Sequence, residues 1–121
     1  MAVNGNGGIG ESYAARYLID KGYTVLASNY SCRFGEIDII ASKGGIVAFV
    51  EVKTRVSDSF AKAMESVNAE KLRRIVTTAG LWISQNNPGL QPRFDVIEVY
   101  LDRRSGKPPR IEHIENVWTG R

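Results

Sequence analysis

Two strand-like runs joined by a Gly-Gly pair at positions 44 and 45 constrain the fold of this chain more than any other feature. The runs cover residues 35–40 and 47–53. Glycine reaches the positive φ angles that tight hairpin turns require, so this connection predicts an antiparallel hairpin. Counting outward from the turn sets Asp38 opposite Glu51. Directly opposed residues point to the same face with Cβ atoms about 4.5 to 5.5 Å apart, so the hairpin predicts two stacked carboxylates.

The predicted pair of carboxylates needs compensation. Two ionised carboxylates about 5 Å apart repel by about 3 kcal/mol at an effective dielectric constant near 20. Asp38 and Glu51 also stand among Ile, Val and Phe residues, where desolvation adds to this cost. A shared proton, the neighbouring Lys53 and a divalent cation are the three candidates. We favour the cation, because two carboxylates with backbone carbonyl and water oxygens are ligands that Mg²⁺ usually takes.

The second run also has a simpler interpretation. Glu51 and Lys53 alone are typical of the solvent face of an amphipathic strand, because a Glu-x-Lys sequence is common. The opposing Asp38 argues against that interpretation. The same register sets Glu36 opposite Lys53, where it would orient the lysine rather than bind a metal. A shift of one residue in the register would move Asp38 to the other face of the sheet.

Hydrophobic periodicity predicts the remaining elements. They are a helix over 11–21, a strand over 24–30, the hairpin, a second helix that Asn68 caps and that ends at 86–89, a strand over 93–101 and a fifth strand over 110–115. Residues 57–67 give no clear pattern beyond a short helical turn. The order α, β, β, β, α, β predicts an α/β fold with a mixed β-sheet flanked by helices on both faces.

Composition limits the chain to one domain, residues 1–121. Its 43% hydrophobic content supports a modest core. We expect residues 1–9 to form a flexible leader, and residues 102–121 to form a basic loop with a C-terminal strand and tail. The lone Cys32 cannot form an intramolecular disulfide, and the sequence has no run of about 18 apolar residues. These features predict a cytoplasmic protein that does not span a membrane.

The charge distribution permits a nucleic-acid partner. The net charge is +3. Arg73 and Arg74 lie beside Lys71 at the start of the second helix, and Arg103 and Arg104 lie in a Gly/Pro-containing loop. Such clusters are usually solvated surface, but beside an acidic site they would contact phosphates independently of base sequence. Lys71 has the same two interpretations, as a solvated lysine on a helix face or as a residue that assists the site.

The spacing of the charged residues resembles a known active site. Asp38, followed after the hairpin by Glu51-Val52-Lys53, resembles the Asp…(Asp/Glu)-x-Lys motif of the PD-(D/E)xK nuclease superfamily. Ile37 stands where the name of the superfamily expects proline, a departure that leaves the carboxylate in place. The resemblance therefore identifies Asp38, Glu51 and Lys53 as the catalytic residues.

A closer resemblance covers most of the chain, from about residue 8 to residue 101. The segments 29–38 and 49–55, with Gly10-Glu11 upstream, resemble the YraN family of small, mostly uncharacterised bacterial proteins. That family is assigned an endonuclease-like fold similar to that of archaeal Holliday-junction resolvases. The resemblance implies a restriction-endonuclease-like αβββαβ core.

The resemblance also implies a metal-dependent nuclease. Asp38, Glu51 and the backbone carbonyl of Val52 would hold Mg²⁺ or Mn²⁺, and Glu11 matches a glutamate that reaches the metal in resolvases of the superfamily. Glu11 has a simpler interpretation as well, because the helix macrodipole favours an acidic residue in a first turn. Lys53 would orient the attacking water and stabilise the developing negative charge.

The implied substrate is DNA, branched or single-stranded, cut in repair or recombination. The expected phosphate contacts are Arg55, Arg73, Arg74, Arg103 and Arg104. Junction resolvases act as homodimers, although no segment here indicates a dimer interface. Two alternatives remain, a noncatalytic nucleic-acid-binding module that retains the fold and a protein-interaction domain that uses Trp118 and the loop around Arg103. We expect the lone His113 to be structural or exposed rather than catalytic.

Overall fold

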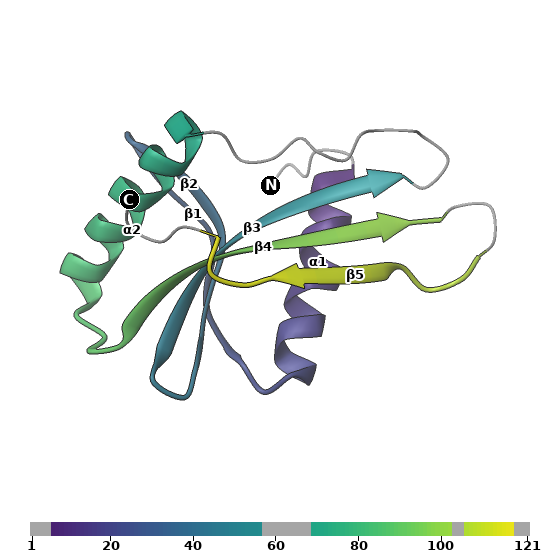
Figure 1. The fold of residues 1–121 in the computed structure, drawn as a ribbon, viewed down its shortest axis with the longest axis horizontal. Helices are drawn as coiled ribbons and strands as arrows, with labels where there is room; N and C mark the ends of the chain where they lie inside the picture. The colour runs from purple at the N-terminus through teal and green to yellow at the C-terminus, as the bar shows by residue number, and fades with distance from the viewer. Residues whose placement is uncertain (1–5, 57–68, 103–105, 118–121) are drawn as a thin grey trace.

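The computed structural model describes residues 6–56, 69–102 and 106–117 of the 121-residue chain. These residues form a mixed five-stranded sheet with a helix on each face (Figure 1). The elements are α1 Asn6–Asp20, β1 Thr24–Cys32, β2 Gly35–Lys43, β3 Ile46–Val56, α2 Ala69–Asn86, β4 Gln91–Leu101 and β5 Arg110–Ile114. The predicted αβββαβ order and the fifth strand are confirmed.

The first helix is longer than its sequence indicates. It begins at Asn6 rather than Glu11, so residues 6–9, which we expected in a flexible leader, are helical. The glycine-rich start of this helix has a poor intrinsic propensity, and the helix approaches β3 closely just after it, at Gly10. Residues 1–5, the expected cap Asn68, the segment 57–67 and Trp118 lie outside the described residues.

The strands lie in the order β1-β2-β3-β4-β5, and every neighbouring pair is antiparallel except β3 and β4. A parallel pair needs a long crossover, and α2 forms part of the connection between these two strands. β3 and β4 pair along their whole lengths, from Ile46 opposite Gln91 to Val56 opposite Leu101. They form the longest continuous pairing in the sheet.

The β2–β3 hairpin has the predicted register. Lys43 pairs with Ile46 across the turn, and the ladder continues to Ile39 opposite Val50. Gly44 has a φ of 61°. A positive φ at the first of two turn residues is the pattern of a type II′ turn, which glycine adopts without strain.

The core has two parts, one on each face of the sheet. The part under α1 contains Leu18, Ile39, Val50 and Ile97, all at most 1% exposed. The part under α2 contains an aromatic group in which the Phe49 ring lies 5.8 Å from that of Trp82 and 5.5 Å from that of Phe94. Since both faces are covered, the central strands read as nearly continuous hydrophobic runs.

Within the described part of the chain, neither helix is long and apolar enough to cross a membrane.

Candidate active site

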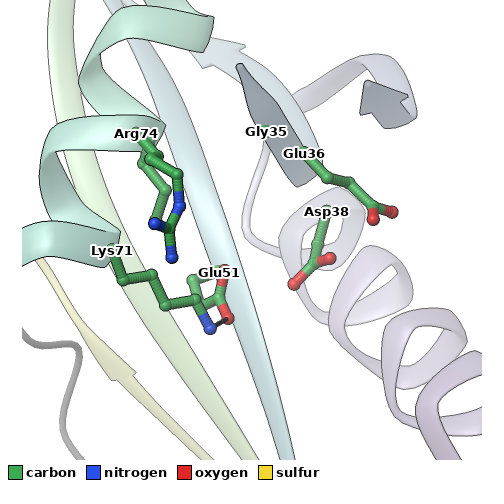
Figure 2. Close-up of a pocket in the computed structure, with 7 residues that line it drawn as sticks. Gly35, Glu36, Asp38, Glu51, Lys71 and Arg74 are labelled. Atoms are coloured by element: carbon green, nitrogen blue, oxygen red, sulfur yellow. Dashed lines mark hydrogen bonds and ion pairs between the residues drawn. The ribbon is translucent and has the colours of Figure 1, made fainter. Parts of the chain in front are cut away.

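An open pocket of about 190 Å³ lies at the point where the β2–β3 ladder ends. Three elements supply its walls, with acidic side chains from the strands and basic side chains from the helix (Figure 2). The lining residues are Gly35, Glu36 and Asp38 of β2, Glu51 of β3, and Lys71, Arg74 and Ile75 of α2. The pocket therefore brings together the two carboxylates that the hairpin register predicted to be opposite each other.

Asp38 lies at an irregular point of β2. Ile37 and Ile40 both pack in the core part under α2, although residues three apart in a regular strand face opposite sides. Asn29 of β1, between the partners of Ile37 and Ile39, has a φ of 53°. The alternation of side chains thus breaks beside Asp38, and a simple count along the strand does not give the direction in which its carboxylate points.

The Asp38 carboxylate bonds to the backbone of β3 just beyond the end of the β2–β3 ladder. Ile39 and Val50 are the last paired residues of β2 and β3. One step further, Asp38 Oδ2 accepts a hydrogen bond of 2.7 Å from the Val52 N–H. The side chain thereby satisfies a β3 donor that a continuing β2 would have paired, and it is held in the gap between the two strands.

Burial and neighbouring carboxylates strongly perturb Asp38. Burial, followed by the charges of Glu51, Glu11 and Glu36, raises the pKa of Asp38 from its ordinary value of 3.8 to about 7, against the lowering effect of the Val52 N–H bond. Both effects disfavour the ionised carboxylate. The predicted electrostatic conflict between Asp38 and Glu51 is therefore present in the structure, and Glu36 and Glu11 contribute to it.

A close helix–strand contact brings Glu11 near this cluster. A Cβ atom on Gly10 would lie 1.8 Å from Thr54 Oγ1 of β3, so glycine allows α1 to approach the strand at this point. Glu11, the next residue, is half-buried. It influences the pKa of Asp38 without lining the pocket. The Gly10-Glu11 pair therefore has a packing reason as well as an electrostatic consequence.

Lys71 belongs to the pocket. Its Nζ donates a hydrogen bond of 2.6 Å to Glu51 Oε2, and the two side chains are 40% and 13% exposed (Figure 2). Its interpretation as a merely solvated lysine is therefore wrong. Lys53 lies two residues after Glu51 on β3 and is half-buried, but it does not line the pocket. A catalytic role for Lys53 stays a prediction.

The contacts of Glu36 and Arg55 in the structure differ from the predicted ones. Glu36 is exposed at the pocket and pairs with Ser31 of β1. It does not pair with Lys53, because the β2–β3 ladder ends at Ile39 and Val50. The Arg55 side chain is only 12% exposed, and its guanidinium lies 3.6 Å from Glu98 Oε2. Arg55 is therefore engaged within the protein in this structure.

The two arginines of α2 are exposed, as a phosphate contact requires. Arg74 lines the pocket and pairs with Glu70 at 3.0 Å. Arg73 lines a neighbouring groove of about 370 Å³, whose other lining residues are Arg33, Phe34, Glu70, Arg74 and Thr77. The sequence reasoning missed Arg33 and Phe34, although an arginine and an aromatic residue in a turn between two strands were a signal. Arg103 and Arg104 lie outside the described residues.

The donor set of the pocket fits a small hard cation. Asp38 and Glu51 offer carboxylate oxygens from two strands. The raised pKa of Asp38 reflects burial first and then the negative charge of its neighbours, and a cation would relieve that charge. The described residues contain no group of three or more Asp, Glu, His or Cys side chains placed to hold a metal ion. Mg²⁺ is often bound by one or two carboxylates together with water and substrate phosphates, so two carboxylates are sufficient.

Sequence comparison finds one matching protein family and similar proteins in several bacteria. The model of "Uncharacterised protein family UPF0102" matches residues 10–99. A UPF0102 protein of Caldanaerobacter subterraneus is 43% identical over 93% of both chains. A UPF0102 protein of Mycolicibacterium vanbaalenii is 42% identical over 92% of this chain and 91% of its own, and one of Clostridioides difficile is 43% identical over 93% and 95%.

Proposed function

This chain belongs to the uncharacterised protein family UPF0102, the YraN family, and we propose that it is a metal-dependent nuclease that hydrolyses phosphodiester bonds in DNA. One observation carries the proposal: Asp38 and Glu51, from two different strands, converge in an open pocket where Asp38 has a pKa near 7. Strongly perturbed carboxylates in a cleft are typical of catalytic sites. An open pocket also admits a polymer.

The residues of the pocket have distinct roles in this proposal. Asp38 and Glu51 would hold Mg²⁺ or Mn²⁺. The superfamily resemblance implies the Val52 carbonyl and Glu11, which do not line the pocket, as further ligands. When bound, such a cation acidifies water and neutralises phosphate charge. Lys71 and Arg74 line the α2 side, where their positive charges favour the scissile phosphate.

Lys53 completes the proposed set. Residues two apart in a strand point to the same face, so Lys53 and Glu51 lie on one side of β3. Lys53 orients the nucleophile, which is the role of the motif lysine in the superfamily that this chain resembles. A branched or junction substrate and a homodimer are the finer form of the proposal, with repair or recombination as the process served.

Cleavage of labelled DNA tests the proposal directly. We expect cleavage of single-stranded or branched DNA in Mn²⁺ or Mg²⁺, and its loss on chelation. Asp38→Asn and Lys53→Ala should each abolish cleavage, by at least about a hundredfold for the loss of one transition-state interaction. Asp20→Asn makes the same chemical change at an exposed site at the end of α1 and should leave the rate unchanged. Full activity of Asp38→Asn would refute the site.

Titration with Mn²⁺ separates metal binding from chemistry. Isothermal titration calorimetry of the wild-type protein and of Asp38→Ala should show binding only in the wild type. If the wild type binds no Mn²⁺ by itself, the titration is repeated with a non-cleavable phosphorothioate oligonucleotide, since phosphate oxygens complete many magnesium sites. Absence of binding in both titrations would contradict the metal-dependent mechanism.

A noncatalytic nucleic-acid-binding module is the second candidate. The ion pair between Lys71 and Glu51 favours it, because an ammonium at 2.6 Å already neutralises one of the two carboxylates. This candidate predicts salt-sensitive DNA binding that survives removal of both Asp38 and Glu51, without cleavage under any metal condition. Measuring binding and cleavage on the wild type and on Asp38→Asn side by side distinguishes the two functions. Cleavage by the wild type that is lost in Asp38→Asn supports the nuclease, and binding by both proteins without cleavage by either supports the module.

A further inference from the structure

The groove beside the acidic pocket presents an exposed aromatic ring among arginines. Phe34, in the turn between β1 and β2, exposes 38% of its surface. The Arg33 guanidinium lies 4.9 Å from the centre of the Phe34 ring. Arg73 and Arg74 line the same groove from α2. We call this site, with Glu70 and Thr77 as its other lining residues, the Phe34 groove.

The Phe34 groove has a positive charge balance. Its lining contains three arginines and one glutamate. Glu70 pairs with Arg74 at 3.0 Å, while Arg33 and Arg73 are exposed and have no carboxylate partner among the residues that the structure describes. An exposed aromatic side chain beside guanidinium groups that have no carboxylate partner in the described part of the chain combines the two features that single-stranded nucleic acids need, a stacking surface for a base and positive charge for the backbone.

The Phe34 groove is continuous with the candidate active site. Arg74 lines both the groove and the acidic pocket, and Gly35 and Glu36 of the pocket directly follow Phe34 in the sequence. Figure 2 shows Arg74 on the wall of the pocket formed by α2, across from Glu36 and Asp38. A nucleic-acid strand held in the groove would therefore lie beside the carboxylates of the acidic pocket.

We propose that the Phe34 groove binds an unpaired nucleotide, with its base stacked on Phe34 and its phosphates on Arg33 and Arg73. The inference rests on the proposed function, and it specifies the substrate as a strand with at least one unstacked base next to the site of cleavage. The bases inside a duplex are stacked on one another and offer no free face to a side chain. Every base has a π face, so this recognition is independent of base identity and is shared by DNA and RNA.

Binding in the absence of cleavage tests this proposal. Fluorescence anisotropy is measured in the Asp38→Asn variant with chelator present, using a short oligothymidylate, an oligouridylate of the same length and a blunt DNA duplex. Phe34→Ala is introduced in that background, and Phe34→Trp keeps a stacking surface. Tyr13→Ala is the matched control, because Tyr13 is an aromatic residue of α1 that is 42% exposed and does not line the groove.

We expect Phe34→Ala to weaken oligothymidylate binding about tenfold, the effect of losing one stacked base. Phe34→Trp and Tyr13→Ala should bind as the parent does, and the affinity for the blunt duplex should not change. A parallel loss with oligouridylate would show that the groove accepts either sugar, and a loss confined to one oligonucleotide would assign it to DNA or to RNA.

Two other results would overturn the proposal in distinguishable ways. If the parent binds oligothymidylate and Phe34→Ala binds equally well, or loses duplex affinity to the same degree, the groove does not hold an unpaired nucleotide while the proposed nuclease function stands. If the parent binds none of the three nucleic acids and wild-type protein cleaves none, the nuclease proposal fails and the groove inference fails with it.

Discussion

Two aspartates of the same sheet, Asp38 on β2 and Asp95 on β4, show opposite ways to place a carboxylate inside a protein. Asp95 is 2% exposed and accepts four hydrogen bonds, two from the Arg93 guanidinium, one from His113 Nε2 and one from the Asn116 N–H. Burial alone would raise the pKa of Asp95, but the bonds from His113 and Arg93 outweigh burial and hold that pKa below its ordinary value. Among the described residues, Asp38 accepts a bond from one backbone N–H and its pKa rises to about 7.

The surroundings of Asp95 form a closed hydrogen-bond network. The ionised carboxylate can only accept, so His113 Nε2 carries a hydrogen, and the Tyr17 hydroxyl of α1 forms a hydrogen bond of 3.2 Å with Nδ1 of the same ring. Arg93 also donates to the Tyr23 hydroxyl at 2.6 Å. The network joins α1, β4 and β5, and it gives His113 the structural role that its sequence context suggested.

The contrast separates a structural carboxylate from a candidate catalytic one. Asp95 has a positive partner and a full set of donors, which makes its charge favourable in the folded state. Asp38 is largely desolvated by burial and has carboxylate neighbours, which makes its charge unfavourable. Buried ionisable groups whose pKa shifts toward neutrality are candidates for function, whereas fully paired groups usually serve the fold.

Removing the satisfied carboxylate should have the largest effect on stability. Asp95→Ala leaves Arg93 and His113 largely buried without their partner, so we expect the free energy of unfolding at neutral pH to fall by about 3 to 5 kcal/mol. Urea unfolding followed by circular dichroism measures it. Glu112→Ala, which removes an exposed ion pair with Arg110, should cost at most about 1 kcal/mol. Equal losses in the two variants would contradict the assigned role of Asp95.

The pH dependence of that loss has a definite sign. The pKa of Asp95 is lowered in the folded state, so its contribution to stability is complete above the ordinary pKa of 3.8 and disappears as the pH falls through the lower folded value. The difference between wild type and Asp95→Ala should therefore persist at neutral pH and shrink in strong acid.

Removing the perturbed carboxylate should have the opposite effect. The pKa of Asp38 is raised from 3.8 to about 7, so ionisation costs stability increasingly between these pH values and fully above them. Asp38→Asn keeps an oxygen that can accept from the Val52 N–H, so it should stabilise the protein at about pH 8. The pKa rise corresponds to about 4 kcal/mol, and solvent screening reduces the expected gain to about half of that. Near pH 4 the gain should vanish.

The same unfolding curves measure this gain. Asp20→Asn, the exposed counterpart, should change stability by less than about 0.5 kcal/mol at either pH. If Asp38→Asn destabilised the protein at high pH, the carboxylate would be favourably placed and its resemblance to a catalytic group would lose its electrostatic support.

The sequence predicted the part of the site that depends on local rules. The Gly-Gly turn and strand alternation set the register as far as Ile39 opposite Val50, and one further step set Asp38 beside Glu51. Burial on both faces made the element order readable from periodicity. These signals need only neighbours in the chain or across one tight turn.

Features that depend on tertiary contacts were not predictable. The hydrogen bond from Lys71 to Glu51 requires α2 to pack beside the end of β3, and helical spacing does not set that distance. The glycine-rich start of α1 is helical against its local propensity, and the close contact of Gly10 with Thr54 joins two segments that lie far apart in the sequence. Asp95 was missed because its partners are spread over residues 93 to 116 and because its charge looked like that of an ordinary polar residue in a strand.

The smallest predicted effect concerns the Lys71 ammonium, which already pairs with Glu51 at the acidic pocket. Lys71→Ala removes the ammonium that pairs with Glu51, a partly exposed ion pair that contributes at most about 1 kcal/mol to folding. If Glu51 and Asp38 hold a divalent cation, Lys71 competes with that cation for Glu51. Mn²⁺ should then bind Lys71→Ala up to about fivefold more tightly than wild type, the equivalent of about 1 kcal/mol.

Calorimetric titration with Mn²⁺ measures this change against a matched lysine. Lys43→Ala removes an exposed lysine beside the hairpin turn, at the far end of the β2–β3 ladder from Asp38, and should leave Mn²⁺ affinity unchanged. Weaker Mn²⁺ binding in Lys71→Ala would mean that the lysine organises the carboxylates instead of competing at them. Tighter binding, together with the stability gained in Asp38→Asn, would show that the negative charge at the pocket is held for a cation, whereas Asp95 already has its own.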